Sequence, residues 1–386
     1  MNYGLKLRIV LLSALFVTFL TSASSWGSAK QEINGVFVPE TPTTKVFVYD
    51  VSDRRSMESI PADPLDTMYS SEFFLVQWIK RSAFAVQDPA VADLFLVPQY
   101  ATHLAHKCTG EGKSLGECAD KIDTEYLLPI VNEVKREVFF KKKQGRDHMW
   151  IFPWDHGSKL FRQSRAQILN CIHIGQDDEE LARPLIIPPP IPISWTWKMT
   201  QESLFLASCI EEGTHSPFCT KVQRAKLIFF SGTIHESRRY SYGVRQDMKE
   251  KFAKLNKPDV DFEAGHVADY KERLLSSVFC LCPPGWAAWS PRIYAAVASG
   301  CLPVIFPLQN FSMRLPFPQK IAWDKFTIKI PSGKHTEVYE ILSAVPKDEI
   351  LRKRLDMTKF ASRILVAQSP DFVVENVILE AQVLSH

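Results

Sequence analysis

The stretch SSVFCLCPPGWAAWSPRIYAAVASGCLPVI, residues 276–305, decides the fold. It opens with a short apolar run that a Pro-Pro-Gly turn ends at residues 283–285, as expected for a buried parallel strand. A helical segment follows Ser290 and ends at Gly300, a residue type common just past a helix C-terminus. Residues 301–306 are apolar again. The stretch therefore predicts a strand, a crossover helix and a second parallel strand.

The same alternation extends to both sides of this stretch. In the second half, residues 226–232 predict a further strand and residues 245–255 a helix. In the first half, strands are predicted at 45–50, 94–97 and 148–153, with helices over 68–85 and 122–143. Each half thus predicts a doubly wound, Rossmann-like parallel sheet, and the chain belongs to the α/β class.

Residues 176–220 break this rhythm with acidic residues and the proline-dense segment IIPPPIPI, which can form neither a helix nor a central strand. We place a domain boundary after it, which gives an N-terminal domain over 45–220 and a second domain over 221–345. Residues 346–386 predict two helices that pack back. The carboxyl ends of the strands in the two domains are expected to face a shared cleft.

The first 26 residues have the layout of a secretory leader. Lys6 and Arg8 precede an apolar run over residues 9–20, and small residues follow at 21–25. A cleaved signal peptide and an uncleaved signal-anchor are equally compatible with this pattern. Either one directs the rest of the chain into the lumen, because the positive charges stay cytoplasmic. Residues 27–44 are rich in Ser, Pro and Thr and predict a stem.

The eight cysteines fit an oxidising compartment. Two pairs that are ten residues apart are candidates for short disulfide loops, Cys108 with Cys118 and Cys209 with Cys219. Cys280 and Cys282 form a C-x-C pattern within an apolar strand, where buried thiols are expected and metal ligands are not.

The charge of the chain is nearly balanced. Its 46 basic and 43 acidic residues give a net charge of +3, too small to create a field that would hold a nucleic acid. The basic cluster at residues 141–143 predicts a solvated helix end rather than a phosphate site.

The predicted strand ends carry the residues with the clearest chemistry. Asp155, His156 and Gly157 follow a strand of the first half, and Gly232 ends a strand of the second. Pro284 and Gly285 turn the chain toward Ser290 and Arg292, at the start of the predicted helix. Free backbone N–H groups and a bidentate guanidinium suit a diphosphate there. An ordinary Pro-Gly turn with a surface arginine is the alternative.

Residues 276–305 resemble the signature of the exostosin family, in which a strand, a P-x-G loop, a Ser-x-Arg pair and a helix precede SGC-(I/L)-PVI. Other blocks occur in the family's order between residue 45 and about residue 345. They are KVFVYD, then Tyr69 with Glu72, DPAVADLFLVPQY, GRDHMWIFPWDHG, RAKLIFFSG with Arg245 downstream, and LPF followed by IAWDKFTIKI.

This resemblance implies a GT-B fold and an inverting hexosyl- or pentosyltransferase that uses a nucleotide sugar, usually a UDP-sugar. Such an enzyme would need no metal or other cofactor. It would be a type II Golgi membrane protein acting on polysaccharide or glycoprotein glycans, or an ER-lumenal or secreted protein if the leader is cleaved. The implied partners are the nucleotide sugar, a glycan acceptor, the membrane through an uncleaved N-terminus and a glycosyltransferase complex, but no nucleic acid.

Roles follow for individual residues. Inversion needs one general base, for which Asp155 and His156 are the candidates; a helix N-cap and a turn histidine are their structural alternatives. Asp147 and His148 are expected to make structural hydrogen bonds. The residues expected to bind the donor are Gly232, Arg245, Pro284, Gly285, Ser290 and Arg292, those expected to stack on sugar are Trp286 and Trp289, and no residue is assigned to a metal.

One position departs from the family pattern. Members commonly carry an acidic residue three positions after the loop arginine, where it can hold the donor ribose, and this chain has Ala295. The alternative function is therefore a non-catalytic relative that binds glycan or donor and partners an active transferase. A glycosidase is less favoured, because it needs two spaced carboxylates and only Asp155 is well placed.

Overall fold

The structure is a computed structural model that describes residues 30–33, 36–39, 43–51, 68–176, 183–189, 224–287, 289–308, 313–365 and 370–386. The chain divides into two units, residues 1–43 and 44–386. In the first unit, β1 (Lys30–Ile33) pairs antiparallel with β2 (Val36–Pro39), within the segment predicted as a stem. The predicted leader, the boundary near residue 220 and the Cys209–Cys219 pair lie outside the described residues.

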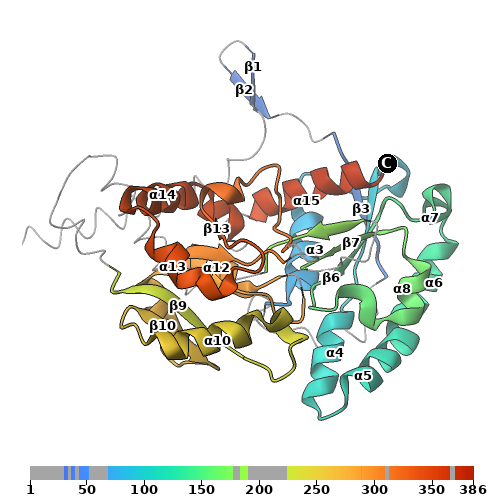
Figure 1. Cartoon of the computed structure of the whole chain (residues 1–386). Helices are drawn as coiled ribbons and strands as arrows, with labels where there is room; N and C mark the ends of the chain where they lie inside the picture. The colour runs from blue at the N-terminus through green and yellow to red at the C-terminus, as the bar shows by residue number, and fades with distance from the viewer. Residues whose placement is uncertain are drawn as a thin grey trace, which may run out of the picture. The chain divides into compact units, whose positions relative to one another are not determined.

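The first half of the larger unit is built on a six-stranded sheet with the order β4-β3-β5-β6-β7-β8. Strands β3, β6 and β7 of this sheet are labelled in Figure 1. All of its paired strands are parallel. The strands are β3 (Val46–Val48), β4 (Ala85–Val86), β5 (Leu94–Val97), β6 (His148–Phe152), β7 (Ile172–Gly175) and β8 (Pro184–Ile186). Along β5, Leu94 and Leu96 belong to one apolar cluster and Phe95 and Val97 to another, so both faces of the strand are buried.

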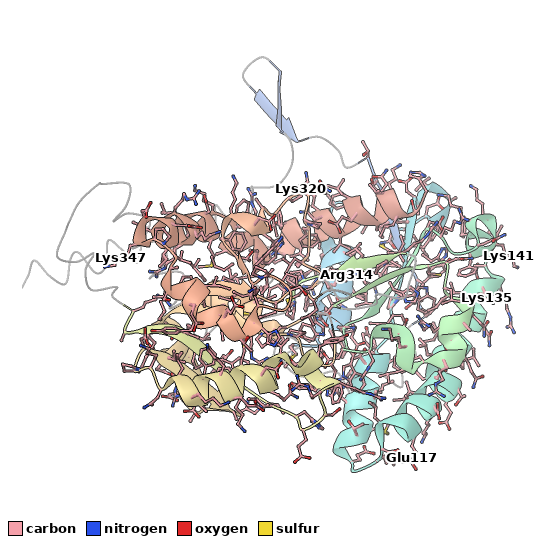
Figure 2. The ribbon with its side chains drawn as sticks, in the orientation of Figure 1. Glu117, Lys135, Lys141, Arg314, Lys320 and Lys347 are labelled. Atoms are coloured by element: carbon pink, nitrogen blue, oxygen red, sulfur yellow. A yellow bond between two sulfur atoms is a disulfide. The ribbon has the colours of Figure 1, made fainter. Side chains whose placement is uncertain are left out.

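Helices supply the partners for these two faces. They are α3 (Ser71–Arg81), α4 (Ala101–Gly110), α5 (Leu115–Ile122), α6 (Leu128–Arg136), α7 (Val138–Lys143) and α8 (Arg162–Gln167), with a π-helical turn η3 (Asp123–Leu127) between α5 and α6. The three lysines at 141–143 end α7 and are all exposed, so the predicted solvated helix end is confirmed. Figure 2 shows Lys141 on the outer side of this helix.

The second half is built on a five-stranded parallel sheet with the order β10-β9-β11-β12-β13. Its strands are β9 (Lys226–Gly232), β10 (Val260–Ala264), β11 (Ser277–Cys282), β12 (Leu302–Ile305) and β13 (Ile328–Lys329), and its helices are α10 (Val244–Leu255), α11 (Tyr270–Leu275), α12 (Pro291–Ser299) and α13 (Val338–Ser343). Helix α12 ends where predicted, at Gly300, whose φ of +66° is one that glycine adopts readily.

In each sheet the first strand along the chain has the second strand on one side and the third strand on the other, and the later strands continue beyond the third. The chain therefore changes direction between β3 and β5 in one sheet and between β9 and β11 in the other. Open parallel sheets bind ligands at such points, at the carboxyl ends of the strands. The two doubly wound sheets confirm the predicted α/β, GT-B-like fold class.

Two helices end the chain, α14 (Lys347–Ile364) and α15 (Pro370–Leu384). Helix α14 contacts α12 in the second half, and Arg354 Nε donates to the carbonyl of Gly300 at 3.1 Å. Helix α15 contacts α3 and β8 of the first half, and the hydroxyl of Thr44 donates to Gln382 Oε1 at 2.6 Å. Among the described residues, no helix is both long and apolar enough to span a bilayer.

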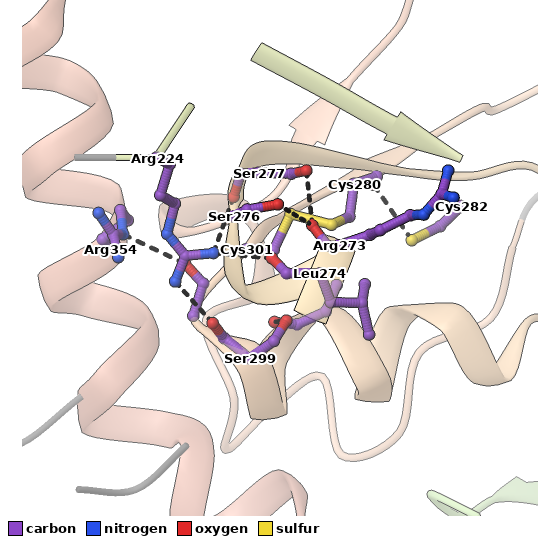
Figure 3. Close-up of a disulfide and its surroundings, with 12 residues drawn as sticks. Arg224, Arg273, Leu274, Ser276, Ser277, Cys280, Cys282, Ser299, Cys301 and Arg354 are labelled. Carbon is purple, nitrogen blue, oxygen red and sulfur yellow. Dashed lines mark hydrogen bonds between the residues drawn. A yellow bond between two sulfur atoms is a disulfide. The ribbon is translucent and has the colours of Figure 1, made fainter. Parts of the chain in front are cut away.

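Two disulfides are present in the described part of the chain. Cys108–Cys118 joins α4 to α5, which confirms that prediction. Cys280–Cys301 joins β11 to the residue just before β12 (Figure 3), so the expectation of a buried thiol was wrong for Cys280 and is confirmed for Cys282. The two cysteines meet because β11 and β12 are adjacent and parallel, which brings the chain back beside Cys280 after α12.

Candidate functional site

The first feature of the site is the start of α12, which follows the loop after β11. Ser290 is the N-cap of this helix, and its hydroxyl accepts a hydrogen bond from the Arg292 amide at 3.4 Å. Pro291 occupies the first turn, where a missing N–H group costs nothing. The Ile293 amide donates to the carbonyl of Ser290 at 3.2 Å. The predicted helix N-terminus, with the positive end of the helix dipole, is therefore present.

Arg292 turns from α12 toward the end of β9. Its Nε donates to the carbonyl of Ser231 at 3.0 Å, and its guanidinium carbon lies 5.3 Å from the centre of the Phe230 ring. A β-carbon on Gly232 would lie 2.0 Å from Arg292 Nη2. Gly232 therefore has to be glycine for the arginine to lie there, and the structure brings these two predicted residues into contact.

Arg245 lies beside Arg292 and joins the loop after β9 to the loop after β11. Its Nη1 donates to the carbonyl of Thr233 at 2.8 Å and to the hydroxyl of Tyr240 at 2.7 Å, and its Nη2 donates to the carbonyl of Pro283 at 3.2 Å. The side chain is buried, and its Nε has no partner among the described residues.

The charge of Arg245 is retained near neutral pH. Burial, and then the neighbouring Arg292, lower the pKa of Arg245 to about 10. Within the described residues its partners are carbonyl and hydroxyl oxygens rather than carboxylates. Two guanidinium groups that have no carboxylate partner in the described part of the chain, next to a helix N-terminus, favour an anionic ligand.

The loop after β11 is held in place by the loop after β9. The carbonyl of Gly285 accepts a hydrogen bond from the Ser241 amide at 2.9 Å, and Pro284 before it is buried. Ser241 and Tyr242 have φ values of +58° and +54°, which are unfavourable for residues other than glycine. Such backbone strain is more common at binding sites than elsewhere.

The two predicted stacking tryptophans differ in exposure. Trp286 is 50% exposed, and its ring meets His235 and Tyr240 edge-on at 5.4 and 5.1 Å. Trp289 is only 6% exposed, and its ring meets Tyr69 of the first half at 6.2 Å. Trp286 therefore has ring surface for a ligand, and Trp289 has little.

Asp155 and His156 follow β6 in the first half and are both half-buried. The hydroxyl of Tyr69 donates to Asp155 Oδ1 at 3.4 Å. His156 precedes a short 3-10 turn, η4 (Gly157–Leu160), and its side chain does not cap that turn. Asp155 is thus linked through Tyr69 to Trp289, in the loop between β11 and α12, whereas no contact of His156 with that loop is present in the described structure.

Sequence reasoning assigned no role to the residues around Asp155. His106 stacks on Tyr69 and on Trp154 at 4.8 and 4.2 Å, and burial followed by the nearby His103 lowers the pKa of His106. Glu72 is fully buried and accepts a hydrogen bond from the His103 amide at 2.7 Å. Burial raises the pKa of Glu72 well above its usual value. The only available signal was that Tyr69 and Glu72 form one of the blocks in the sequence resemblance.

Asp147 and His148 lie away from this cluster and have the structural role predicted for them. His148 is fully buried, with Nδ1 2.7 Å from Asp147 Oδ1 and Nε2 3.1 Å from the hydroxyl of Tyr49. Burial lowers the pKa of His148, so the ring remains neutral at physiological pH.

Two further observations concern Ala295 and the position of a cavity. Ala295, where an acidic residue was expected, is 5% exposed and packs within the apolar core. A cavity of about 690 Å³ in the described structure is lined by residues of β8 and of the segment 313–325, with Lys329 and Glu380, and by none of the predicted site residues. We place the site by the convergence of charge and strand ends, because an open phosphate site need not be a deep cavity. The described residues contain no cluster of His, Cys, Asp or Glu suited to a metal.

Similarity to known proteins extends over most of the chain. The exostosin GT47 domain model matches residues 40–345. A probable glucuronosyltransferase of Oryza sativa subsp. japonica is 29% identical over 333 residues, covering 80% of this chain and 70% of its own length. A probable beta-1,4-xylosyltransferase of Arabidopsis thaliana is 27% identical over 374 residues, covering 89% and 83%. Among solved structures, Anabaena HepE in complex with UDP-glucose has a TM-score of 0.37 and 10% identity, covering 85% of this chain and 98% of its own.

Proposed function

Since this chain belongs to the exostosin GT47 family, we propose that it is a glycosyltransferase that moves a sugar from a UDP-sugar donor to a glycan. The curated relatives are named as probable glucuronosyltransferases and probable xylosyltransferases. These names favour a hexuronosyl or pentosyl donor and a polysaccharide acceptor. A glycoprotein glycan is the second acceptor class to test.

The observation that carries this proposal is the convergence of Arg245 and Arg292 at the ends of β9 and β11, beside the start of α12. A departing UDP carries its new charge on the diphosphate. Guanidinium groups and a helix dipole that are already in place would stabilise that charge without reorganising. They support a mechanism in which neither a metal ion nor another cofactor is needed.

On the acceptor side, we assign the general base to Asp155. Its carboxylate would take the proton of the attacking hydroxyl while UDP leaves from the opposite face of the sugar, which inverts the anomeric centre. His156 is the second candidate for this step. Trp286, with its exposed ring, would stack on the transferred sugar or on the acceptor.

The cellular location belongs to the same proposal. We expect the folded body to lie in the Golgi lumen, held by the N-terminal segment as a type II membrane protein. The disulfides Cys108–Cys118 and Cys280–Cys301 support an oxidising compartment, because such bonds are rare in the cytosol. Association with other glycosyltransferases at that membrane is the expected interaction.

One observation favours the alternative of a non-catalytic partner subunit. The buried Ala295 provides no carboxylate for the donor ribose, so another group has to hold the ribose if the enzyme is active.

The test is to incubate the purified protein with a panel of UDP-sugars, with and without oligosaccharide acceptors and with and without EDTA. We expect UDP release that depends on acceptor, persists in EDTA and yields a product of inverted configuration by NMR. Donor binding without transfer would favour the partner role. Absence of UDP binding would overturn the enzyme assignment and favour a partner that binds glycan alone.

A further inference from the structure

Tyr69 connects the two sides of the proposed site. Its hydroxyl donates to Asp155 Oδ1 at 3.4 Å, and its ring meets Trp289 at 6.2 Å with an interplanar angle of 76°. Trp289 directly precedes Ser290, the N-cap of α12. One side chain therefore contacts both the candidate base and the loop that leads to the diphosphate-binding helix.

The hydroxyl of Tyr69 acts as a donor in this arrangement. Burial first, and then the charge of Asp155 and the hydrogen bond to it, raise the pKa of Tyr69 well above its usual value. The phenol stays protonated at physiological pH and cannot itself serve as the base. Donation to the carboxylate stabilises the ionised form of Asp155.

Residues of the first half hold the ring of Tyr69 in place. It stacks on His106 at 4.8 Å, and His106 in turn stacks on Trp154, the residue before Asp155. Two residues further along the chain from Tyr69, α3 begins, and its buried Glu72 binds the His103 amide in the first turn of α4. Tyr69 thus lies between α4, the end of β6 and the loop that connects β11 to α12.

We propose that Tyr69 is a positioning residue that orients the Asp155 carboxylate through its hydroxyl and couples that carboxylate to the donor-binding loop through its ring. This inference rests on the proposed function, because it assumes that Asp155 is the base. In the reaction, the proton of the acceptor hydroxyl passes to Asp155. The new C–O bond forms at the anomeric carbon, and the bond to UDP breaks with its electron pair on the diphosphate.

Loss of the Tyr69 hydroxyl should change the pH dependence of the reaction rate. Of the described residues, Tyr69 contacts Asp155, His106 lies behind Tyr69, and His156 follows Asp155 in the sequence. Removing the donated hydrogen bond destabilises the carboxylate, so the acid limb of the rate profile should move to higher pH. A purely structural role would lower stability without moving this limb.

The test compares Tyr69→Phe with Tyr49→Phe in the full chain. Tyr49 is a matched control, because its hydroxyl lies 3.1 Å from His148 Nε2, on a buried pair outside the site. In Tyr69→Phe we expect kcat/KM to fall about tenfold at neutral pH and the acid limb to move up by roughly one pH unit. UDP affinity should stay within about twofold, since the ring is kept. Tyr49→Phe should lower thermal stability and leave the profile in place.

A second variant, Tyr69→Leu, removes the ring as well. It should repeat the shift in the profile and also weaken UDP binding by about three- to tenfold, because Trp289 loses its edge contact. An unmoved acid limb in Tyr69→Phe, or equal UDP affinity in both Tyr69 variants, would overturn the inference.

A measurement independent of turnover separates this inference from the proposed function. Unfolding of wild type, Tyr69→Phe, Asp155→Asn and the double variant at pH 7 gives the coupling between the two side chains. We expect a measurable coupling that disappears at a pH low enough to protonate Asp155. An inactive wild type that keeps the coupling overturns the enzyme assignment and supports the contact, whereas zero coupling overturns the contact whatever the activity.

Discussion

The guanidinium of Arg292 lies so close to the α-carbon of Gly232 that a β-carbon there would be 2.0 Å from Nη2. This contact joins the first strand of the second sheet to the helix that follows its third strand, across the point where the chain changes direction. The absence of a side chain at the end of β9 is therefore part of how the proposed diphosphate site is built.

The first prediction concerns that contact. Gly232→Ala should displace Arg292 and weaken UDP binding by about tenfold or more, with the fold retained, because one charged hydrogen-bonding group would be lost. Isothermal titration with UDP measures this change. Gly116→Ala is the control, since a β-carbon there meets nothing within 4 Å and should leave affinity unchanged. Normal affinity in Gly232→Ala would place the diphosphate elsewhere.

The second prediction concerns the arginine itself. Arg292→Ala should weaken UDP binding by about 10- to 100-fold, as expected for loss of a hydrogen bond to a charged ligand. Arg292→Lys should recover only part of the affinity, because a lysine cannot reproduce the planar fork. Arg238→Ala is the matched control: Arg238 lies on the β9 loop, is 61% exposed and pairs with Asp247. Equal losses in Arg292→Ala and Arg238→Ala would indicate a general charge effect.

The third prediction separates the two candidate bases. Asp155→Asn should reduce kcat by about 10²- to 10⁴-fold while UDP affinity is unchanged, because general-base assistance is lost and the donor side is not. His156→Gln should have a much smaller effect on kcat. Initial rates at saturating donor and acceptor measure both. The reverse order of effects would transfer the base role to His156.

The fourth prediction concerns the Cys280–Cys301 disulfide, which closes a 21-residue segment around α12. Replacing both cysteines by alanine should lower the free energy of unfolding by about 3 kcal/mol, from the entropy of closing a loop of that length. Cys282→Ala is the control, since this thiol is buried but unbridged. Denaturant unfolding distinguishes them, and equal stability of wild type and the double variant would contradict the prediction.

The fifth prediction concerns pH. Burial lowers the pKa of His173 to about 4, and its Nε2 lies 2.9 Å from the carbonyl of Ile168. In the unfolded chain the His173 ring binds a proton near pH 6.5, whereas in the folded chain it does so only near pH 4. The resulting stability is complete above pH 6.5 and is lost progressively below it, by up to about 3 kcal/mol. In His173→Gln the loss of stability between pH 7 and 4.5 should be smaller than in wild type, and an identical pH dependence would exclude this role.

The sequence was most informative where apolar runs are long and bounded by glycine or proline. The predicted strand over 226–232 coincides with β9, and the predicted helix after Ser290 with α12. It was least informative for short or partly polar strands. β7 (IHIG) and β10 (VDFEA) were not predicted, because four or five residues containing His, Asp or Glu have no clear period.

Contacts between distant residues account for the rest. The Cys280–Cys301 bond depends on the register of β11 and β12, and the hydrogen bond from Tyr69 to Asp155 joins residues 86 positions apart. No local pattern encodes such a pair. The burial of Trp289, which leaves Trp286 as the exposed ring, likewise depends on packing against the first half of the unit.

The hydrogen bond between Thr44 and Gln382 has a consequence for how the chain can be cut and rejoined. It brings the beginning and the end of the 343-residue folded unit together, since that unit spans 44–386. A short peptide could therefore bridge them and new ends could be opened in an exposed loop, as in other circularly permuted domains. Removing α15 instead would uncover apolar side chains of α3, so the last helix is a required part of the first half despite its place at the end of the chain.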